Sequence, residues 1–142
     1  MKITEGCFEV TGHTSIICDF SPPRSGDSAV VTQAQIDADF ILVAYNPGRA
    51  VRTNSAMLAA AIQQSGKDAV FTLATRDMNK LALQSQLLGA QMLGLQNVVV
   101  VQGDPFGQQD QGRVASVDDY HTTGLVTAIA QMNQGQDFKD GQ

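Results

Sequence analysis

The sequence has few cysteines and histidines, and their spacing argues against a metal site. Only Cys7, Cys18, His13 and His121 occur in 142 residues. The cysteines form no C-x-x-C pair, and no cluster has the spacing of metal ligands. We therefore expect two reduced thiols near a core and no bound metal. Each histidine stands alone, and no Ser-His-Asp set can be assembled from the spacing.

The chain also has no long apolar run and no excess of positive charge. A membrane-spanning helix needs roughly 18 or more consecutive apolar residues, and Met1–Val10, which contains Glu5 and Glu9, does not resemble a signal peptide. The net charge is −5, whereas proteins that bind nucleic acids normally present a basic face. These absences predict a cytoplasmic protein that binds neither membranes nor nucleic acid.

Two fingerprints of nucleotide binding are absent as well. The glycine- and glutamine-rich stretch Gly103–Gly112 matches neither the P-loop nor the G-x-G-x-x-G turn. A dinucleotide site of the Rossmann type therefore has no support in the sequence.

What the sequence does contain is one pattern repeated four times: an apolar run, a polar or Gly/Pro turn, and a helical stretch. The runs are Ser15–Phe20, Phe40–Tyr45, Ala69–Thr75 and Asn97–Val101, and their starts lie 25 to 29 residues apart. This spacing predicts βα units with parallel strands in sequential order. Their continuous apolarity, as in Val98–Val101, predicts strands buried on both faces.

Four βα units make one α/β domain, residues 1–142, and are half of a (β/α)8 barrel of the TIM type, although a four-stranded open sheet fits the pattern equally. The crossover at Val30–Ala38 is short, and its helix is the least defined. Before the first unit, Phe8–Val10 predicts a short plug strand.

The other three helices have recognisable ends. Asn54 or Ser55 predicts one helix start, Asp77 the start of the longest helix, and Asp118 or Asp119 the start of the last. Glycines end these helices, at Gly66, Gly94 and Gly135. The apolar positions that we expect to face the core are Met57, Leu58, Ala61 and Ile62 in the first, Leu81, Leu87, Leu88 and Met92 in the second, and Leu125, Val126, Ile129 and Met132 in the third.

Sites in parallel α/β folds form at the carboxyl ends of the strands. Asp19 lies in an apolar strand end, where desolvation would favour a neutral carboxyl group that can act as a general acid. The alternative is that Asp19 caps the Pro22-Pro23 turn. Asp104 follows Gly103, which would let a ligand approach the backbone, or it belongs to an ordinary Asp-Pro turn. Arg76 either contacts a phosphate or is a solvated residue at a helix start; the second reading is favoured.

At these strand ends the chain resembles the methylenetetrahydrofolate reductase family. The resemblance rests on an ordered set of blocks rather than on any one of them, and it covers the first half of the family's fold. The blocks are Cys18–Arg24, Asn46–Gly48, Arg52–Ser55, Thr75–Asn79, Leu83–Ala90, Gly94–Asn97, Gln102–Pro105 and Asn133–Phe138.

The resemblance implies a flavoprotein oxidoreductase on a (β/α)8 barrel with FAD at the carboxyl ends of the strands. Such an enzyme uses NAD(P)H to reduce 5,10-methylenetetrahydrofolate to 5-methyltetrahydrofolate, in one-carbon metabolism and methionine biosynthesis. The second half of the barrel would supply further FAD, folate and nicotinamide contacts. An alternative is therefore a non-catalytic half barrel that needs a complementary chain, and another is an unrelated α/β binding module. Open sheet edges predict a homo-oligomer or pairing with a complementary second-half chain.

The resemblance also implies roles for individual residues. Asp19 matches the acidic residue that promotes protonation of the folate, where the best-known members have Glu. Asp104 matches an aspartate close to pterin and flavin that stabilises the cationic iminium form of the folate. The implied cofactor contacts are Ala44, Tyr45, Thr72, Gln102, Gly103 and Asp104. Since Ala44, Thr72 and Gln102 stand where well-known members have Thr, His and Arg, we expect the flavin's potential and affinity to differ.

Overall fold

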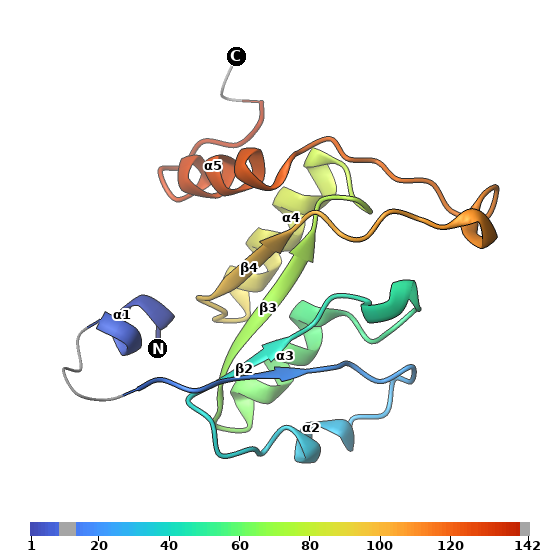
Figure 1. Cartoon of the computed structure of the whole chain (residues 1–142). Helices are drawn as coiled ribbons and strands as arrows, with labels where there is room; N and C mark the ends of the chain where they lie inside the picture. The colour runs from blue at the N-terminus through green and yellow to red at the C-terminus, as the bar shows by residue number, and fades with distance from the viewer. Residues whose placement is uncertain (9–13, 140–142) are drawn as a thin grey trace. The chain divides into compact units, whose positions relative to one another are not determined.

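The computed structural model describes residues 1–8 and 14–139 and shows strands alternating with helices (Figure 1). The elements in chain order are α1 (Ile3–Phe8), β1 (Ile17–Phe20), α2 (Val30–Gln33), β2 (Phe40–Val43), the 3-10 turn η1 (Pro47–Arg49), α3 (Ser55–Gln64), β3 (Asp68–Ala74), α4 (Lys80–Met92), β4 (Val98–Val101), the 3-10 turn η2 (Gln108–Asp110) and α5 (Thr122–Met132). None of the helices in the described ranges has the length and apolarity that a membrane crossing requires.

The four strands form one parallel sheet in the order β1-β2-β3-β4. β1 pairs with β2, and β2 with β3, both in parallel. The β3–β4 pairing runs in the same sense, because Phe71 N–H donates to the Asn97 carbonyl and Thr75 N–H to the Val101 carbonyl, with a constant offset along both strands. The predicted half-barrel-like α/β fold with sequential parallel strands is confirmed.

The chain forms two compact units. The first comprises Met1–Thr72 with Ala90–Val99, and the second comprises Leu73–Gly89 with Val100–Gln142, so that β3 and β4 each run from one unit into the other.

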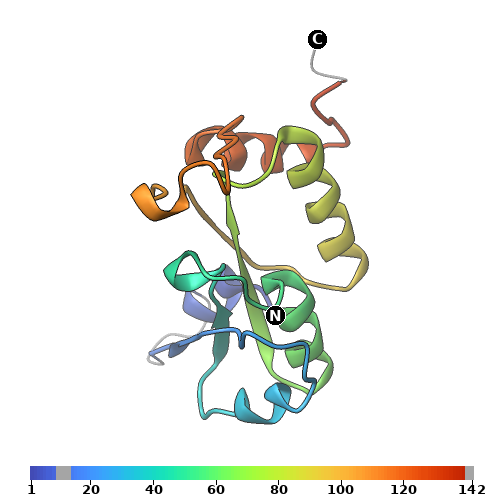
Figure 2. The ribbon, with the colours of Figure 1, turned by 90° about the vertical axis from the view of Figure 1, so that its right-hand side faces the viewer.

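The core of the first unit lies around β2, β3 and α3. Phe40, Ile41 and Val43 in β2 are fully buried, and α3 runs alongside β2 (Figure 2). Continuous apolar runs are therefore buried on both faces in β2 and β3, as predicted.

The two edge strands differ from that prediction. Ile17 in β1 is 45% exposed, and Val101 at the end of β4 is 36% exposed. The prediction of burial on both faces is wrong for β1 and β4, because each has a paired neighbour on one side only.

The N-terminus is tied to the first unit by a polar cluster. The Met1 ammonium lies 2.6 Å from the Asp68 carboxylate. The side chain of Asn97, which is 9% exposed, accepts a hydrogen bond from Ile3 N–H and donates one to the Met1 carbonyl, each at 2.8 Å. The predicted plug strand is wrong at Phe8, which is the last residue of α1, and Glu9 and Val10 lie outside the described residues.

Helix α3 begins where the sequence predicts. The Asn54 side chain accepts hydrogen bonds from the N–H groups of Ala56 and Met57, both at 3.0 Å, which satisfies two donors at the helix start. Leu58 and Ile62 are buried as expected, but Met57 is 50% exposed, so that its assignment to the core face is wrong.

Helices α4 and α5 start later than predicted, because the aspartates expected to cap them bind elsewhere. α4 begins at Lys80, and the Asn79 side chain accepts from Ala82 N–H at 2.9 Å. Asp77 pairs with Arg76 instead. Asp119 accepts from Lys80 N–H at 3.1 Å, while α5 begins at Thr122.

The core face of α4 is also different from the predicted one. Leu83 and Ala90 are buried, whereas Leu81, Leu88 and Met92 are 62%, 58% and 83% exposed. The helix carries two apolar stripes at helical spacing, and periodicity alone does not say which one is covered. In α5, Leu125 is buried as predicted, but Val126 is 55% exposed.

The cap of α3 gives a stability prediction. We expect Asn54→Ala to lower the free energy of unfolding by about 1 kcal/mol, because two N–H groups lose their acceptor. Asn54→Asp is the matched control: it keeps the acceptor and adds a negative charge at the helix start, so it should retain stability. Urea unfolding followed by circular dichroism measures both variants, and equal midpoints for Asn54→Ala and the parent chain would contradict the cap's role.

Candidate functional site

The predicted site residues divide between the two units. Asp19, Ala44, Tyr45 and Thr72 belong to the first unit, and the predicted residues after β4 belong to the second. That Asp19 and Asp104 face one common pocket stays a prediction.

Asp19 lies in β1, opposite Leu42 of β2, and its side chain is exposed. The expected desolvation of this carboxyl group is wrong, because β1 is an edge strand of the sheet. An exposed carboxylate at this strand end remains accessible to a substrate.

The loop that follows Asp19 is held by the segment before α3. The Arg52 guanidinium donates to the Pro22 carbonyl at 3.0 Å, and Thr53 N–H donates to the Pro23 carbonyl at 2.9 Å. Arg52 N–H in turn donates to the Asn46 side chain at 3.0 Å. The turns after β1 and β2 are thus fixed to each other through residues 52 and 53.

The other predicted cofactor residues of the first unit are less open. Ala44 and Tyr45, directly after β2, are half-buried, and Ala44 N–H donates to the Phe20 carbonyl at 3.0 Å. Thr72 in β3 is only 7% exposed, and its carbonyl accepts a hydrogen bond of 2.7 Å from the buried Ser55 hydroxyl.

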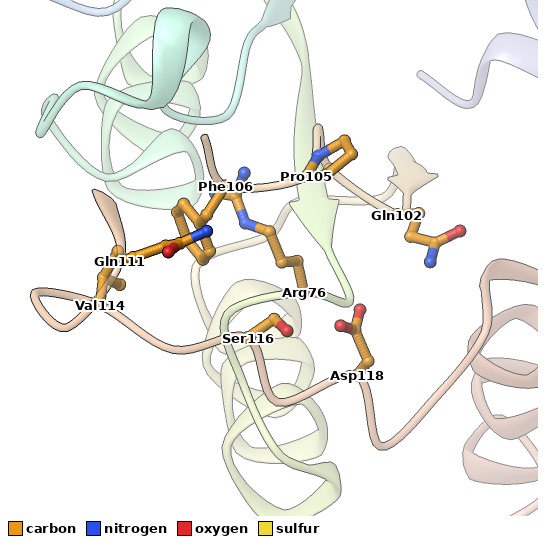
Figure 3. Close-up of a pocket in the computed structure, with 9 residues that line it drawn as sticks. Arg76, Gln102, Pro105, Phe106, Gln111, Val114, Ser116 and Asp118 are labelled. Atoms are coloured by element: carbon orange, nitrogen blue, oxygen red, sulfur yellow. The ribbon is translucent and has the colours of Figure 1, made fainter. Parts of the chain in front are cut away.

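In the second unit, a cavity of about 510 Å³ lies at the carboxyl ends of β3 and β4 (Figure 3). Its size falls within the range of about 300–1,000 Å³ that is usual for ligand pockets. The residues that line it are Arg76, Gln102, Gly103, Pro105, Phe106, Gln111, Val114, Ser116 and Asp118. Two predicted cofactor contacts, Gln102 and Gly103, are therefore at a cavity.

Arg76 lines this cavity and is 6% exposed, so its interpretation as a solvated residue at a helix start is wrong. Its Nε and Nη2 donate to the two carboxylate oxygens of Asp77 at 2.6 and 2.8 Å, and its Nη1 donates to the Asp104 carbonyl at 2.6 Å. The guanidinium carbon lies 4.1 Å from the centre of the Phe106 ring. These three contacts fix the plane of the Arg76 guanidinium. Arg76 therefore orients the residues that follow β3 and β4.

Gly103 is required by the position of Arg76. Its φ of +94° is a conformation that favours glycine, and a Cβ atom placed there would lie 3.2 Å from the Arg76 Cβ. Arg76 N–H donates to the Gln102 carbonyl at 3.0 Å, which extends the β3–β4 ladder beyond the strands. Asp104 contributes its carbonyl to Arg76, while its exposed side chain is not among the residues that line the cavity.

The loop before α5, where the sequence predicts a helix cap, also lines the cavity through Val114, Ser116 and Asp118. Val117 N–H donates to the Arg76 carbonyl at 2.6 Å and so holds the loop on the β3 end. Asp118 follows with φ +48°, and its Oδ1 is buried without a hydrogen-bond partner in the described part of the chain. No local pattern marks Asp118 as a cavity residue, because its role depends on where the loop returns to β3.

A metal site finds no support in the described ranges. Across residues 1–8 and 14–139, no group of three or more His, Cys, Asp or Glu side chains could hold a metal ion.

The contact between Gly103 and Arg76 can be measured. We expect Gly103→Ala to lower the free energy of unfolding by about 1–2 kcal/mol for the positive φ and by about 1–3 kcal/mol more for crowding against Arg76. Gly112→Ala is the control, because Gly112 also has a positive φ of +75° but no atom within 4 Å of its Cβ position. Equal losses in the two variants, measured by thermal unfolding, would show that the Arg76 contact contributes nothing.

The comparisons with known proteins agree with this arrangement of strands and strand ends. The family model described as methylenetetrahydrofolate reductase matches residues 6–141, which is nearly the whole chain. No curated protein and no solved structure gives a significant match. The family is one of oxidoreductases that act on folate in one-carbon metabolism. The chain belongs to the methylenetetrahydrofolate reductase family.

Proposed function

We propose that this chain carries the flavin- and folate-facing strand ends of an FAD-dependent reductase that converts 5,10-methylenetetrahydrofolate to 5-methyltetrahydrofolate with NAD(P)H in the cytoplasm, as part of methionine biosynthesis. The observation that carries the proposal is the cavity at the ends of β3 and β4. It collects Gln102 and Gly103, two residues that the family resemblance marks as cofactor contacts.

The residues of this cavity fit a flavin. Pro105, Phe106 and Val114 offer an apolar and aromatic surface to a planar ring. Bound FAD supplies hydride-transfer chemistry that no side chain provides. Ala44, Tyr45 and Thr72, which the family resemblance also marks as cofactor contacts, stay predicted contacts.

Asp19 is proposed as the acid of the folate half-reaction. The methylene bridge of the substrate must be protonated before its ring opens, and a carboxyl group can deliver that proton. The exposed position of Asp19 at the end of β1 leaves it accessible to a substrate, and Arg52 and Thr53 hold the loop that follows.

Asp104 is proposed to stabilise the positive charge that protonation creates on the folate. Its carboxylate carries the opposite charge, and its backbone is fixed by the 2.6 Å hydrogen bond from Arg76. A negative group held in place before the reaction needs no reorganisation when the charge appears.

A second proposal concerns assembly. The apolar residues exposed on β1 and β4 are those that a neighbouring strand would cover in a closed sheet. We propose that the chain forms a homo-oligomer or pairs with a complementary chain, and that a half barrel without its complement is not catalytic.

Measuring the two half-reactions separately tests the acid role of Asp19 apart from the cofactor chemistry. In the assembled enzyme, Asp19→Asn should slow reduction of the folate by about 10²- to 10⁴-fold, because Asn has no proton to give, while reduction of the flavin by NAD(P)H keeps its rate. Stopped-flow absorbance of the flavin measures both steps. The control is Asp37→Asn, which neutralises another exposed carboxylate of the first unit. Equal slowing of both half-reactions, or of neither, would remove Asp19 from the mechanism.

The assembly proposal predicts an effect of charge on the edge strand. Ile17→Lys should shift the chain toward monomer in sedimentation velocity at high concentration, since a lysine on an exposed edge opposes strand pairing. Val51→Lys is the control, because Val51 is 86% exposed in a loop. A parent chain that is monomeric at every concentration, and stays so with any candidate partner, would contradict the proposal.

A further inference from the structure

We propose that two copies of this chain close one eight-stranded parallel barrel, in which β4 of each copy pairs with β1 of its partner. Each site then combines Asp19 of one copy with the cavity at the ends of β3 and β4 of the other. The roles of Asp19 and Asp104 are those of the proposed function, on which the shared site rests. The partner is a second copy of the chain, and the acid of each site comes from it.

The two edge strands lack the features that keep exposed edges from pairing. Natural edge strands are protected by charged side chains, by proline, by bulges or by a covering segment. The run Asn97–Gln102 around β4 has no charged residue and no proline, and Ser15–Phe20 around β1 has one charge, Asp19. In the described part of the chain, the sheet order gives each of these strands one neighbour. Both edges can therefore accept a further strand.

A second copy supplies both missing neighbours at once. The strands are parallel and in sequential order, so a β1 beside β4 continues the same direction. A two-fold axis makes the two contacts identical, because β4 of each copy meets β1 of the other. Four strands from each copy make eight, the number that closes a parallel βα barrel. Pairing of like edges, β1 with β1 or β4 with β4, would instead leave one edge of each copy exposed.

The side chains of the two edges suit this contact. Ile16 and Ile17 at β1 are 56% and 45% exposed, and Val101 of β4 is 36% exposed. Burying them between the copies removes apolar surface from water. Because β4 consists of four valines, Asp19 meets no like charge along the strand pair. The contact therefore gains apolar burial without charge repulsion.

Closure changes which residues share a site. Within one chain, two strands separate β1 from β4, and strands about 4.8 Å apart place these two about 14 Å from each other. Between the two copies, β4 and β1 are neighbours. Since all strands point the same way, Asp19 of the partner copy lies at the same end of the sheet as Gln102 and Gly103, which line the cavity. A single copy lacks an acid on the strand next to its cavity.

Disulfide cross-linking tests the strand contact without any measurement of activity. In a Cys7→Ser background, Cys18 in β1 is the remaining cysteine, and a second one is placed at each position of β4 in turn, which covers both faces and several registers. The four variants are Val98→Cys, Val99→Cys, Val100→Cys and Val101→Cys. Mild oxidation should give a disulfide-linked dimer for one or more of them. A disulfide needs Cα atoms within about 7 Å, which neighbouring strands meet and the separation within one chain exceeds.

Adding Cys18→Ser to each variant is the control, and it should abolish the linked dimer. Circular dichroism verifies the fold of every variant. A dimer that persists without Cys18 would indicate that β4 pairs with β4, and the proposed contact would be wrong. Failure of all four positions to cross-link would equally exclude it. Polymers in sedimentation velocity, in place of a dimer, would mean that the copies pair in an open row and close no barrel.

A mixing experiment tests the shared site. Asp19→Asn and Asp104→Asn are co-expressed with different tags, and purification on both tags isolates the mixed dimer. In that dimer, one site keeps Asp19 from one copy and Asp104 from the other, while the second site has lost both. With FAD, NAD(P)H and 5,10-methylenetetrahydrofolate supplied, the mixed dimer should recover about half of the parent's folate reduction, because one of two equivalent sites is intact. Each variant alone should stay slow, Asp19→Asn by about 10²- to 10⁴-fold.

The matched control for mixing pairs Asp19→Asn with the double variant Asp19→Asn/Asp104→Asn, which leaves no intact acid in either copy. Recovery in the mixed dimer that does not exceed this control would overturn the shared site and leave the proposed reductase intact. A cross-linked parent dimer that reduces no folate would defeat the proposed function, and the shared catalytic site with it, while the contact between β4 and β1 would stand.

Discussion

The burial of β3 is the constraint on which most of the structure depends. Its residues from Ala69 to Ala74 are all buried, and it hydrogen-bonds to β2 on one side and β4 on the other. A strand covered in this way must be largely apolar, and its parallel neighbours are connected to it through helical crossovers. Because the ladder continues past the strands, from Arg76 N–H to the Gln102 carbonyl, the segments after β3 and β4 leave the sheet side by side. The cavity lies where these two segments leave the sheet.

A buried cation then organises the residues around that point. Arg76 is almost fully covered, and a covered guanidinium is tolerated only when its donors are paired. Asp77 supplies the countercharge and the Asp104 carbonyl a third acceptor, while Gly103 leaves space for the side chain to pass. The cavity wall around Arg76 therefore contains charged groups, but most of their hydrogen-bonding atoms are paired within the protein. Among the cavity residues, Asp118 has one buried oxygen, Oδ1, without a hydrogen-bond partner in the described part of the chain.

The edge strands of the sheet differ from β3 in burial, because burial depends on how many neighbours a strand has. β1 and β4 have the apolar composition of central strands, but each lacks a neighbour on one side, so Ile17 and Val101 remain open to solvent. Their composition suits a larger closed sheet better than an open one of four strands. The exposed position of Asp19 has the same origin, since it lies in β1.

The sequence by itself determined the features that depend on near neighbours. Apolar runs located all four strands, their spacing predicted parallel order, and Asn54 marked the start of α3 because a cap involves residues only two and three positions away. The ordered blocks at the strand ends were enough to indicate the family. Tertiary structure alone decided the features that depend on distant partners: the buried stripe of α4, the exposure of Asp19, and the pairing of Arg76 with Asp77 and Asp104. Whether an aspartate caps a helix, pairs with an arginine or lines a cavity depends on which loop returns to it, and no local pattern contains that information.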